Sequence, residues 1–235
     1  MTILALDSSG PVCSVALMRD GKIIAEAAQN NGLTHSQTLM PMLDGVLEAA
    51  AVAPGELELI ACVAGPGSFT GVRIGVCAAK ALAHAHNIPC AQLNALEVLA
   101  AGTFGFEGVV CPILDARRGQ VYGAGFQCVQ GDVPVRLMDD AALPLDAYME
   151  RLPKKERLLF VGDGVFVHGD RVLATLGERA LIAPPHRSQL SAATACVLAA
   201  AGAGVRTDYL GLMPLYLRQS QAERERLANE GKRVE

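Results

Sequence analysis

The sequence predicts an α/β protein with two related lobes. Two observations favour this class: short apolar strands alternate with helical segments, and one order of elements occurs twice. Residues 3–28 and residues 109–138 both give a strand that ends in an aspartate turn, then a second strand, a turn and a third strand. Repetition over so long a period is typical of an internal duplication. The chain of 235 residues is long enough for two small lobes.

The first lobe should open with three strands. Residues 2–6 are apolar and end at a turn that begins with Asp7, residues 12–18 alternate, and residues 23–28 follow an Asp-Gly hairpin signal. Asp7 has two interpretations. It either bonds its own backbone as a turn residue, which the sequence alone favours, or it contacts a phosphate or a metal-bound water at the end of a central strand.

A helix is expected next, over residues 36–51. Its large apolar residues share one face at helical spacing, while Asp44 and Glu48 lie on the other side. The apolar face includes Leu39, Met42, Leu43, Val46 and Leu47.

The most informative stretch combines a strand, a glycine loop and a helix. Residues 59–64 form an apolar strand, the segment Gly-Pro-Gly-Ser at 65–68 breaks it, and a helix follows over residues 71–86. Ser68 and Thr70 are both candidates for its N-cap, and Asn87 and Pro89 should end it. Backbone N–H groups at such a helix start can hold an anion. A tight turn that needs glycine for steric reasons is the more frequent explanation of a single Gly-x-Gly.

The helix over residues 71–86 carries a basic stripe and a broad apolar surface. The stripe consists of Arg73, Lys80 and His84. The residues opposite the stripe, which should lie close to a sheet, are Gly75, Ala78 and Leu82. One flank of the stripe consists of Val72, Val76 and Ala83. An apolar arc this wide indicates neighbours at the sides of the helix as well as beneath it.

A short helix over residues 95–101 precedes the second lobe, whose first strand, residues 109–114, ends at Asp115. The remaining elements expected are strands over 121–129, 133–138, 157–161 and 180–183 and helices over 145–152, 166–176 and 191–201. We therefore divide the chain into an N-terminal lobe (1–104), a smaller C-terminal lobe (105–217) and a charged, mobile tail (218–235).

Composition limits the function. The formal net charge is −4, and no basic face of the kind that holds nucleic acid is evident. The seven cysteines form no C-x-x-C pair and have mostly apolar neighbours, which indicates reduced thiols in a cytoplasmic protein. The first residues lack the basic region of a signal peptide. The longest apolar run, residues 192–205, is too short to span a membrane.

Two lobes that each end a first strand at an aspartate suggest the architecture of actin and the sugar kinases, in which two lobes face each other across a nucleotide cleft. The motifs AGPGSFTGVRIG (64–75), LALDSS near the start, DARRGQVY (115–122) and PLYLR (214–218) closely resemble the TsaB family, also called YeaZ. The resemblance covers nearly the whole chain. It implies the actin-like fold and a place in the bacterial machinery that makes threonylcarbamoyladenosine in tRNA.

The TsaB family has a catalytic sister family, TsaD, in which a His-x-x-x-His pair follows the shared glycine-loop helix and binds a metal. One helical face can carry both imidazoles to one metal. Alignment by the shared loop places Ala95 and Leu99 at these positions, and neither side chain can bind a metal. Glu97 lies between them and cannot hold a metal alone, and the adjacent Asn94 is a poor substitute. We therefore expect no metal site and no catalytic residue.

The resemblance implies a non-catalytic subunit that binds TsaD and activates or stabilises it, with the ATPase TsaE joining the assembly. TsaD would then modify the adenosine at position 37 of tRNAs that read ANN codons. On this interpretation the chain requires no cofactor and binds no nucleotide in isolation. It forms a homodimer when TsaD is absent, contacts tRNA only through the complex and does not contact a membrane.

Two sets of site residues are expected. The helices over 36–51 and 71–86 should together form the partner surface. The interface candidates are Leu39, Met42, Leu43, Val46, Leu47, Val72, Arg73, Val76, Lys80, Ala83 and His84. The candidates for a vestigial phosphate loop are Asp7, Ser8, Ser9, Gly65, Gly67, Ser68 and Asp115.

Two alternatives stay open. The first is an active actin-like ATPase or kinase that uses Asp7, the glycine loop and Asp115 in a nucleotide cleft of its own, with the Gly-Asp-Gly at 162–164 as the one candidate for an adenosine pocket. The second is a glycoprotease-like peptidase. No Ser/His/Asp or Cys/His set supports it, because five scattered histidines do not reveal which residues are close in space.

Overall fold

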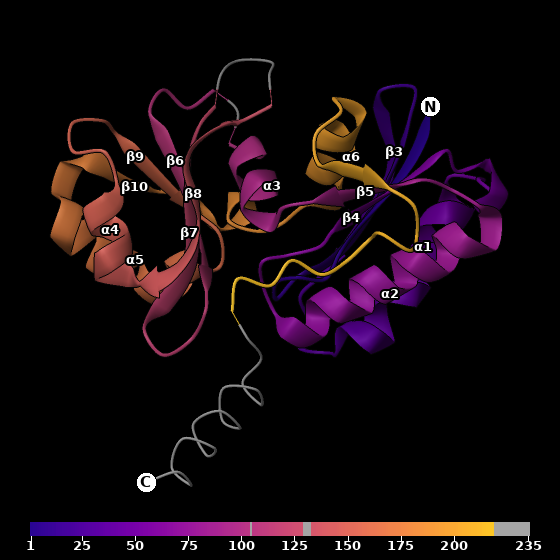
Figure 1. Ribbon diagram of the computed structural model, residues 1–235, viewed down its shortest axis with the longest axis horizontal. Helices are drawn as coiled ribbons and strands as arrows, with labels where there is room; N and C mark the ends of the chain where they lie inside the picture. Colours follow the sequence, from indigo (N-terminus) through magenta and orange to yellow (C-terminus); the bar gives the residue numbers. More distant parts are fainter. Residues whose placement is uncertain (104, 129–132, 219–235) are drawn as a thin grey trace, which may run out of the picture.

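The computed structural model describes residues 1–103, 105–128 and 133–218. It contains two mixed β-sheets with helices on their faces (Figure 1). The first sheet has the strand order β11-β5-β4-β1-β2-β3, and the second has the order β10-β9-β6-β7-β8. In both sheets an antiparallel meander continues into parallel strands. The predicted two-lobed α/β fold is confirmed.

The same order of elements, βββαβαβα, occurs twice along the chain, as expected of the actin-like fold. The first copy consists of β1 (Thr2–Asp7), β2 (Cys13–Arg19), β3 (Lys22–Gln29), α1 (His35–Ala49), β4 (Leu59–Val63), α2 (Phe69–His86), β5 (Cys90–Leu93) and α3 (Ala95–Ala101). The second copy consists of β6 (Val109–Asp115), β7 (Gln120–Gln127), β8 (Val135–Pro144), α4 (Leu145–Arg151), β9 (Leu158–Val161), α5 (Gly164–Leu176), β10 (Ala180–Ile182) and α6 (Ala192–Ala200), after which comes β11 (Val205–Thr207).

Two short strands, β5 and β11, were not expected from the sequence. β5 has four residues and β11 has three, so neither is long enough to show the alternation that marks a strand. The turn expected at residues 130–132 and the tail beyond Arg218 lie outside the described residues.

The central strands of the first sheet are apolar throughout because both faces of the sheet are covered. Every residue of β1 and β4 is buried. On one face Leu4 and Ile60 belong to the core beneath α1 and α2, and on the other Ile3 and Ala61 belong to the core beneath α3 and α6. A continuous apolar run is typical of a strand in this position.

Both ends of α2 have the caps that the sequence predicts. The Ser68 hydroxyl accepts a hydrogen bond from the Gly71 N–H (3.2 Å) at the N-terminus. Asn87 adopts the left-handed conformation (φ 53°) just past the C-terminus. The helix begins at Phe69, two residues before the predicted start, because Ser68 rather than Thr70 is the N-cap.

The last elements return to the first lobe. α6 packs on β1 and β2 across the sheet from α1 and α2, and β11 pairs with β5 at the edge of the first sheet (Figure 1). The prediction that assigned residues 105–217 to the second lobe therefore needs correction from Ala192 onward. α6 is apolar on nearly all sides, and its hydrophobic pattern does not reveal which sheet it covers.

The two lobes share one apolar core. Ile3 and Ala61 of the first sheet belong to the same buried cluster as Leu114 and Phe126 of the second. The short helix α3 lies between the sheets and contacts both β6 and α6 (Figure 1). The lobes are therefore joined by packed side chains as well as by the connecting chain.

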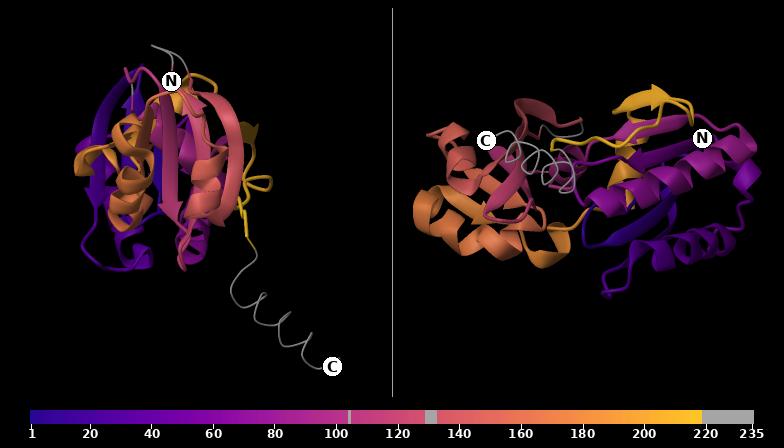
Figure 2. Two further views of the ribbon diagram at one scale, coloured as in Figure 1. Left: turned by 90° about the vertical axis from the view of Figure 1, so that its left-hand side faces the viewer. Right: turned by 60° about the horizontal axis from the view of Figure 1, so that its bottom comes forward.

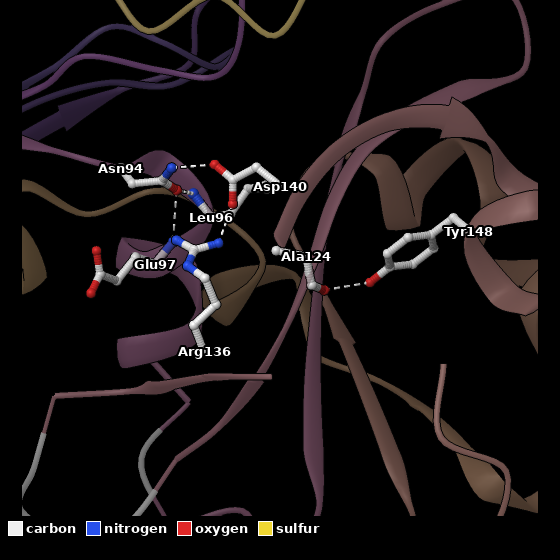
Figure 3. A network of polar contacts seen from close by, with 7 residues as sticks. All are labelled: Asn94, Leu96, Glu97, Ala124, Arg136, Asp140 and Tyr148. Carbon is white, nitrogen blue, oxygen red and sulfur yellow. Dashed lines mark hydrogen bonds and ion pairs between the residues drawn. The ribbon is translucent and has the colours of Figure 1, made fainter. Parts of the chain in front are cut away.

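A hydrogen bond between Asn94 and Asp140 adds to this connection between the lobes. Asn94 caps α3 by accepting the Leu96 N–H (2.8 Å), and its amide nitrogen donates to Asp140 on β8. Arg136, on the same strand as Asp140, also donates to this carboxylate and fixes its position (Figure 3). The Asn94 contact therefore holds the start of α3 against the edge strand of the second sheet. In the same view the Tyr148 hydroxyl points at the Ala124 carbonyl and donates to it (2.7 Å), which holds α4 on β7.

Among the helices within the described residues, none combines the length and the apolar character needed to cross a bilayer.

Candidate functional site: an interlobe cleft and a helical face

A cleft of about 600 Å³ lies between the two lobes. The turn after β1, the loop before α2 and the turn after β6 all contribute to its walls, together with residues near the C-terminal end of the described chain. In α/β sheets such a position, at the carboxyl ends of the strands, is where ligands usually bind. The predicted phosphate-loop residues that line the cleft are Ser9, Gly67, Ser68 and Asp115. Those that lie outside its wall are Asp7, Ser8 and Gly65.

The turn after β1 and the glycine loop interlock. The Ser68 N–H donates to the Ser9 carbonyl (2.7 Å), and the Ser8 hydroxyl donates to the Gly71 carbonyl (2.8 Å). A Cβ atom on Gly67 would lie 2.2 Å from the Ser9 carbonyl oxygen, and one on Gly71 would lie 2.1 Å from that of Ser8. Close packing of two backbones therefore explains these glycines, and the Ser68 N–H is bonded within the protein.

Asp7 is buried at the end of β1. One carboxylate oxygen accepts the Ser9 N–H (3.0 Å) and the Ser9 hydroxyl (2.7 Å), while Oδ2 has no hydrogen-bond partner among the described residues. Burial raises the pKa of Asp7 to about 6, against the opposing effect of the Ser9 hydrogen bonds, and Asp163 raises it further. Asp7 is thus both the turn residue that the sequence favoured and a carboxylate with spare bonding capacity.

The second lobe places two more carboxylates at the cleft. Asp163, at the start of α5, accepts the Asp115 N–H (3.0 Å), and burial raises the pKa of Asp163 to about 6. Asp115 accepts the Arg117 N–H (2.8 Å) and lies 3.8 Å from the His168 ring. The sequence indicated Asp115 as a turn residue at the end of a strand. It did not indicate Asp163 as its partner, because the two residues are far apart along the chain.

Three basic side chains also line the cleft: His35, Arg117 and Arg218. Two of them contact backbone carbonyls, since His35 Nε2 lies 2.8 Å from the Gly10 oxygen and Arg218 donates to the Ala116 oxygen (3.1 Å). Carboxylates and cations facing one cavity suit a polar ligand. Whether this cleft holds a phosphate stays a prediction.

The positions compared with the metal ligands of the TsaD family lie on α3. Ala95 and Leu99 are both buried in the core that the lobes share. Within residues 1–103, 105–128 and 133–218, no three His, Cys, Asp or Glu side chains are grouped so that they could hold a metal ion.

The predicted partner surface needs a correction. The apolar interface candidates of both helices are buried in the chain's own core, with Val76 only 3% exposed. These residues are Leu39, Met42, Leu43, Val46, Leu47, Val72, Val76 and Ala83. The cause is that α1 and α2 pack on the sheet and on each other. Helical spacing in the sequence shows that these residues share one face of each helix. It does not show whether that face packs inside the chain or against another protein.

The basic stripe of α2 has an intramolecular partner that the sequence did not suggest. Residues 208–218, which we call the C-terminal strap, run along α2 in the opposite direction (Figure 2, right). His84 packs on Tyr209 at one end (ring centroids 4.4 Å apart), and Lys80 donates to the Leu212 carbonyl (3.2 Å). At the other end Arg73 donates to the Tyr216 hydroxyl (2.7 Å).

The residues of the two helices that remain exposed are mostly small or polar, and Met40 on α1 is a large apolar exception. On α1 they include Met40, Asp44, Gly45, Glu48 and Ala49. On α2 they include Arg73, Cys77, Ala81, His84 and Ala85. The signs of the exposed charges differ between the helices, as the sequence predicts, with carboxylates on α1 and basic groups on α2.

Comparison with known proteins gives consistent results. A family model described as TsaD, tRNA N6-adenosine threonylcarbamoyltransferase, matches residues 22–225. The tRNA threonylcarbamoyladenosine biosynthesis protein TsaB of Bacillus subtilis (strain 168) is 38% identical over 227 residues, which cover 95% of this chain and 96% of that protein. TsaB of Escherichia coli (strain K12) is 36% identical over 129 residues, covering 54% of this chain and 55% of the relative. The solved structure of YeaZ from Pseudomonas aeruginosa is similar with a TM-score of 0.77 at 30% identity, covering 92% of this chain and 99% of that one.

Proposed function

This chain belongs to the TsaB family, and on that premise we propose that it is the non-catalytic subunit of a complex that forms threonylcarbamoyladenosine at position 37 of tRNAs reading ANN codons. Its role is to bind a TsaD-like catalytic subunit and to keep it active or stable, with a TsaE-like ATPase joining the assembly. The observation that carries the proposal is the 38% identity to the B. subtilis protein over 95% of the chain. That likeness extends through both lobes rather than resting on one motif.

The chemistry of α3 supports a role without catalysis. Transfer chemistry that depends on a metal needs side chains that can donate electron pairs to it. At Ala95 and Leu99 the chain has aliphatic side chains packed in the core. The same helix is tied to β8 by the Asn94–Asp140 contact, so in this chain α3 connects the lobes.

The proposed partner surface is the exposed side of α1 and α2. Gly45, Ala81 and Ala85 are small and exposed there, so a partner helix could approach closely. The TsaD family model matches this chain through both helices. A TsaD-like subunit would therefore present equivalent helices, and pairing could be pseudo-symmetric. The same surface would close the homodimer that we propose for the chain without TsaD.

One variant tests this surface directly. Ala81→Glu places a charge on an exposed position of α2, whereas Ala174→Glu makes the same change on an exposed position of α5 in the second lobe. We expect Ala81→Glu to keep the circular dichroism of the wild type and to lose the TsaD-like subunit from the same organism in size-exclusion chromatography. Ala174→Glu should still co-elute with it.

The function itself is tested in the host bacterium. Depletion of the protein should lower threonylcarbamoyladenosine in total tRNA, measured by liquid chromatography and mass spectrometry. Wild type and Ala174→Glu should restore the modification, and Ala81→Glu should not. Unchanged modification after depletion would rule out the proposed function.

We propose that no nucleotide is required. The glycine loop supports this, because its Ser68 N–H is bonded to the Ser9 carbonyl. Calorimetry with ATP and Mg²⁺ tests the proposal. Saturable binding by the isolated chain, with hydrolysis that Asp115→Ala abolishes, would favour the ATPase alternative.

A further inference from the structure

The C-terminal strap is fixed to both lobes. Leu212 is fully buried, the Met213 N–H donates to the Gln92 side chain (2.9 Å), and the Leu215 N–H donates to the Ala64 carbonyl (2.7 Å). Gly65 allows this approach, since a Cβ there would lie 2.7 Å from the Leu215 carbonyl oxygen. At the end of the strap Arg218 bonds to the second lobe. The strap therefore has a defined path over the surface.

The outer side of this fixed segment is apolar. Leu210 is 66% exposed and Met213 is 55% exposed, and Tyr216 and Leu217 are exposed as well. The segment that carries them runs beside α2 (Figure 2, right). Between Arg206 and Arg218 the chain has one charged residue, Asp208, and its carboxylate accepts the N–H groups of Leu210 and Gly211 within the strap (2.9 and 2.8 Å).

The helix beside this apolar row is basic. α2 has no acidic residue, and its Arg73 is exposed next to the strap. The one carboxylate of the strap, Asp208, is occupied by two N–H groups of the strap itself. The carboxylates of α1, Asp44 and Glu48, belong to the other helix. A complementary partner would therefore offer an apolar surface edged with carboxylates. A nucleic acid or a lipid headgroup would gain little from the apolar row.

We infer that the C-terminal strap is a third part of the partner surface, and that Leu210 and Met213 contact an apolar helix face, flanked by carboxylates, of the TsaD-like subunit. This inference rests on the proposed function. It also changes the role of the α2 stripe. Arg73, Lys80 and His84 hold the strap in place, and the exposed Arg73 would also face the carboxylates of the partner. Because the strap is ordered before binding, little conformational entropy is lost on association.

Two exposed positions outside the strap provide matched controls. Val205 on β11 and Val167 on α5 are each 63% exposed, so a charge at either site should leave the fold as intact as a charge on the strap. We would compare Leu210→Glu and Met213→Glu with Val205→Glu and Val167→Glu. The measurement is the affinity for the purified TsaD-like subunit, by biolayer interferometry.

We expect each strap variant to lose about tenfold or more in affinity, because a buried unpaired charge costs several kcal/mol. The two controls should stay within about threefold of wild type, a change of about 0.7 kcal/mol. Hydrogen exchange at residues 208–217 should also slow in the wild-type complex.

The outcomes separate the two proposals. If the wild type binds the TsaD-like subunit and both strap variants bind equally well, the strap inference is wrong and the proposed function stands. If the strap variants lose self-association but still bind the TsaD-like subunit, the strap contacts a second copy of this chain, and the inference that it contacts the TsaD-like subunit is wrong. If the wild type does not bind the TsaD-like subunit, both proposals fail together.

Discussion

Asp7 offers a test of the electrostatics of the cleft that needs no partner. The carboxyl group is fully buried, and its Oδ2 atom has no hydrogen-bond partner among the described residues. Its pKa of about 6 in the folded protein compares with an ordinary value of 3.8. The folded chain therefore binds a proton at Asp7 more tightly than the unfolded chain does.

The sign of the pH dependence follows from this difference. Between about pH 4 and pH 6 the folded state holds a proton at Asp7 that the unfolded state has released, so the free energy of unfolding falls as the pH rises through this window. Stability from the protonated carboxyl is fully present below about pH 4 and lost above about pH 6. Asp163, whose pKa is also raised to about 6, changes in the same direction.

Asp7→Asn removes the charge and keeps an oxygen for the two Ser9 donors. A pKa difference from 3.8 to about 6 corresponds to about 3 kcal/mol of destabilisation at neutral pH. The new amide N–H group has no acceptor in place of Oδ2, which costs about 1–2 kcal/mol. We expect the variant to be more stable than wild type at pH 7.5 by about 1–2 kcal/mol.

The assay is urea unfolding followed by circular dichroism at pH 4.5 and pH 7.5. Asp7→Asn should reduce the difference in unfolding free energy between the two pH values, while Asp44→Asn, at an exposed position of α1, should leave both values within about 0.5 kcal/mol of wild type. If Asp7→Asn is less stable at pH 7.5 and has the pH dependence of wild type, the ionised carboxylate is stabilising and the reasoning is refuted.

Four further outcomes are expected. Val76→Glu should unfold the monomer, because a buried unpaired charge costs about 3–5 kcal/mol; a folded variant by circular dichroism would show that this side of α2 is exposed in solution. Asp140→Ala should lower the free energy of unfolding by about 1–2 kcal/mol and speed hydrogen exchange at the start of α3, because Asn94 loses its acceptor. Unchanged exchange there would show that the Asn94–Asp140 hydrogen bond does not hold α3. Elemental analysis should find no stoichiometric zinc or iron, because Ala95 and Leu99 cannot bind a metal. The isolated chain has a net charge of −4, so its dissociation constant for tRNA in filter binding should exceed about 1 μM at physiological salt. Tighter binding that depends strongly on salt would contradict the prediction that the chain contacts tRNA only through the complex.

The duplication could be predicted from sequence because its signals are local. β1 and β6 each end at an aspartate, and each continues into an antiparallel meander. Turns and strands can be recognised from residues that are close together in the sequence. The glycine loop and both caps of α2 were predictable for the same reason, because Ser68 and Asn87 act on neighbouring backbone groups.

The features that sequence reasoning missed depend on contacts between distant segments. α6 is apolar on nearly all sides, so its pattern could not assign it to the first sheet. The apolar faces of α1 and α2 were assigned to a partner, although the sheet and the neighbouring helix already cover them. The sequence showed that Arg73 and Lys80 lie on one side of a helix. It did not show that both contact the strap, which is more than 100 residues away along the chain.

The strap also connects the two parts of the candidate site. Its outer row, Leu210 and Met213, lies beside α2, and its last residues, Tyr216 to Arg218, line the cleft. Arg218 bonds to the carbonyl of Ala116, next to Asp115, on the second lobe. The lobes also share a core, which opposes movement of one lobe against the other. A partner bound along α2 would therefore affect the cleft by fixing the strap residues that line it. If the proposed partner surface is correct, residues 208–218 would couple it to the cleft.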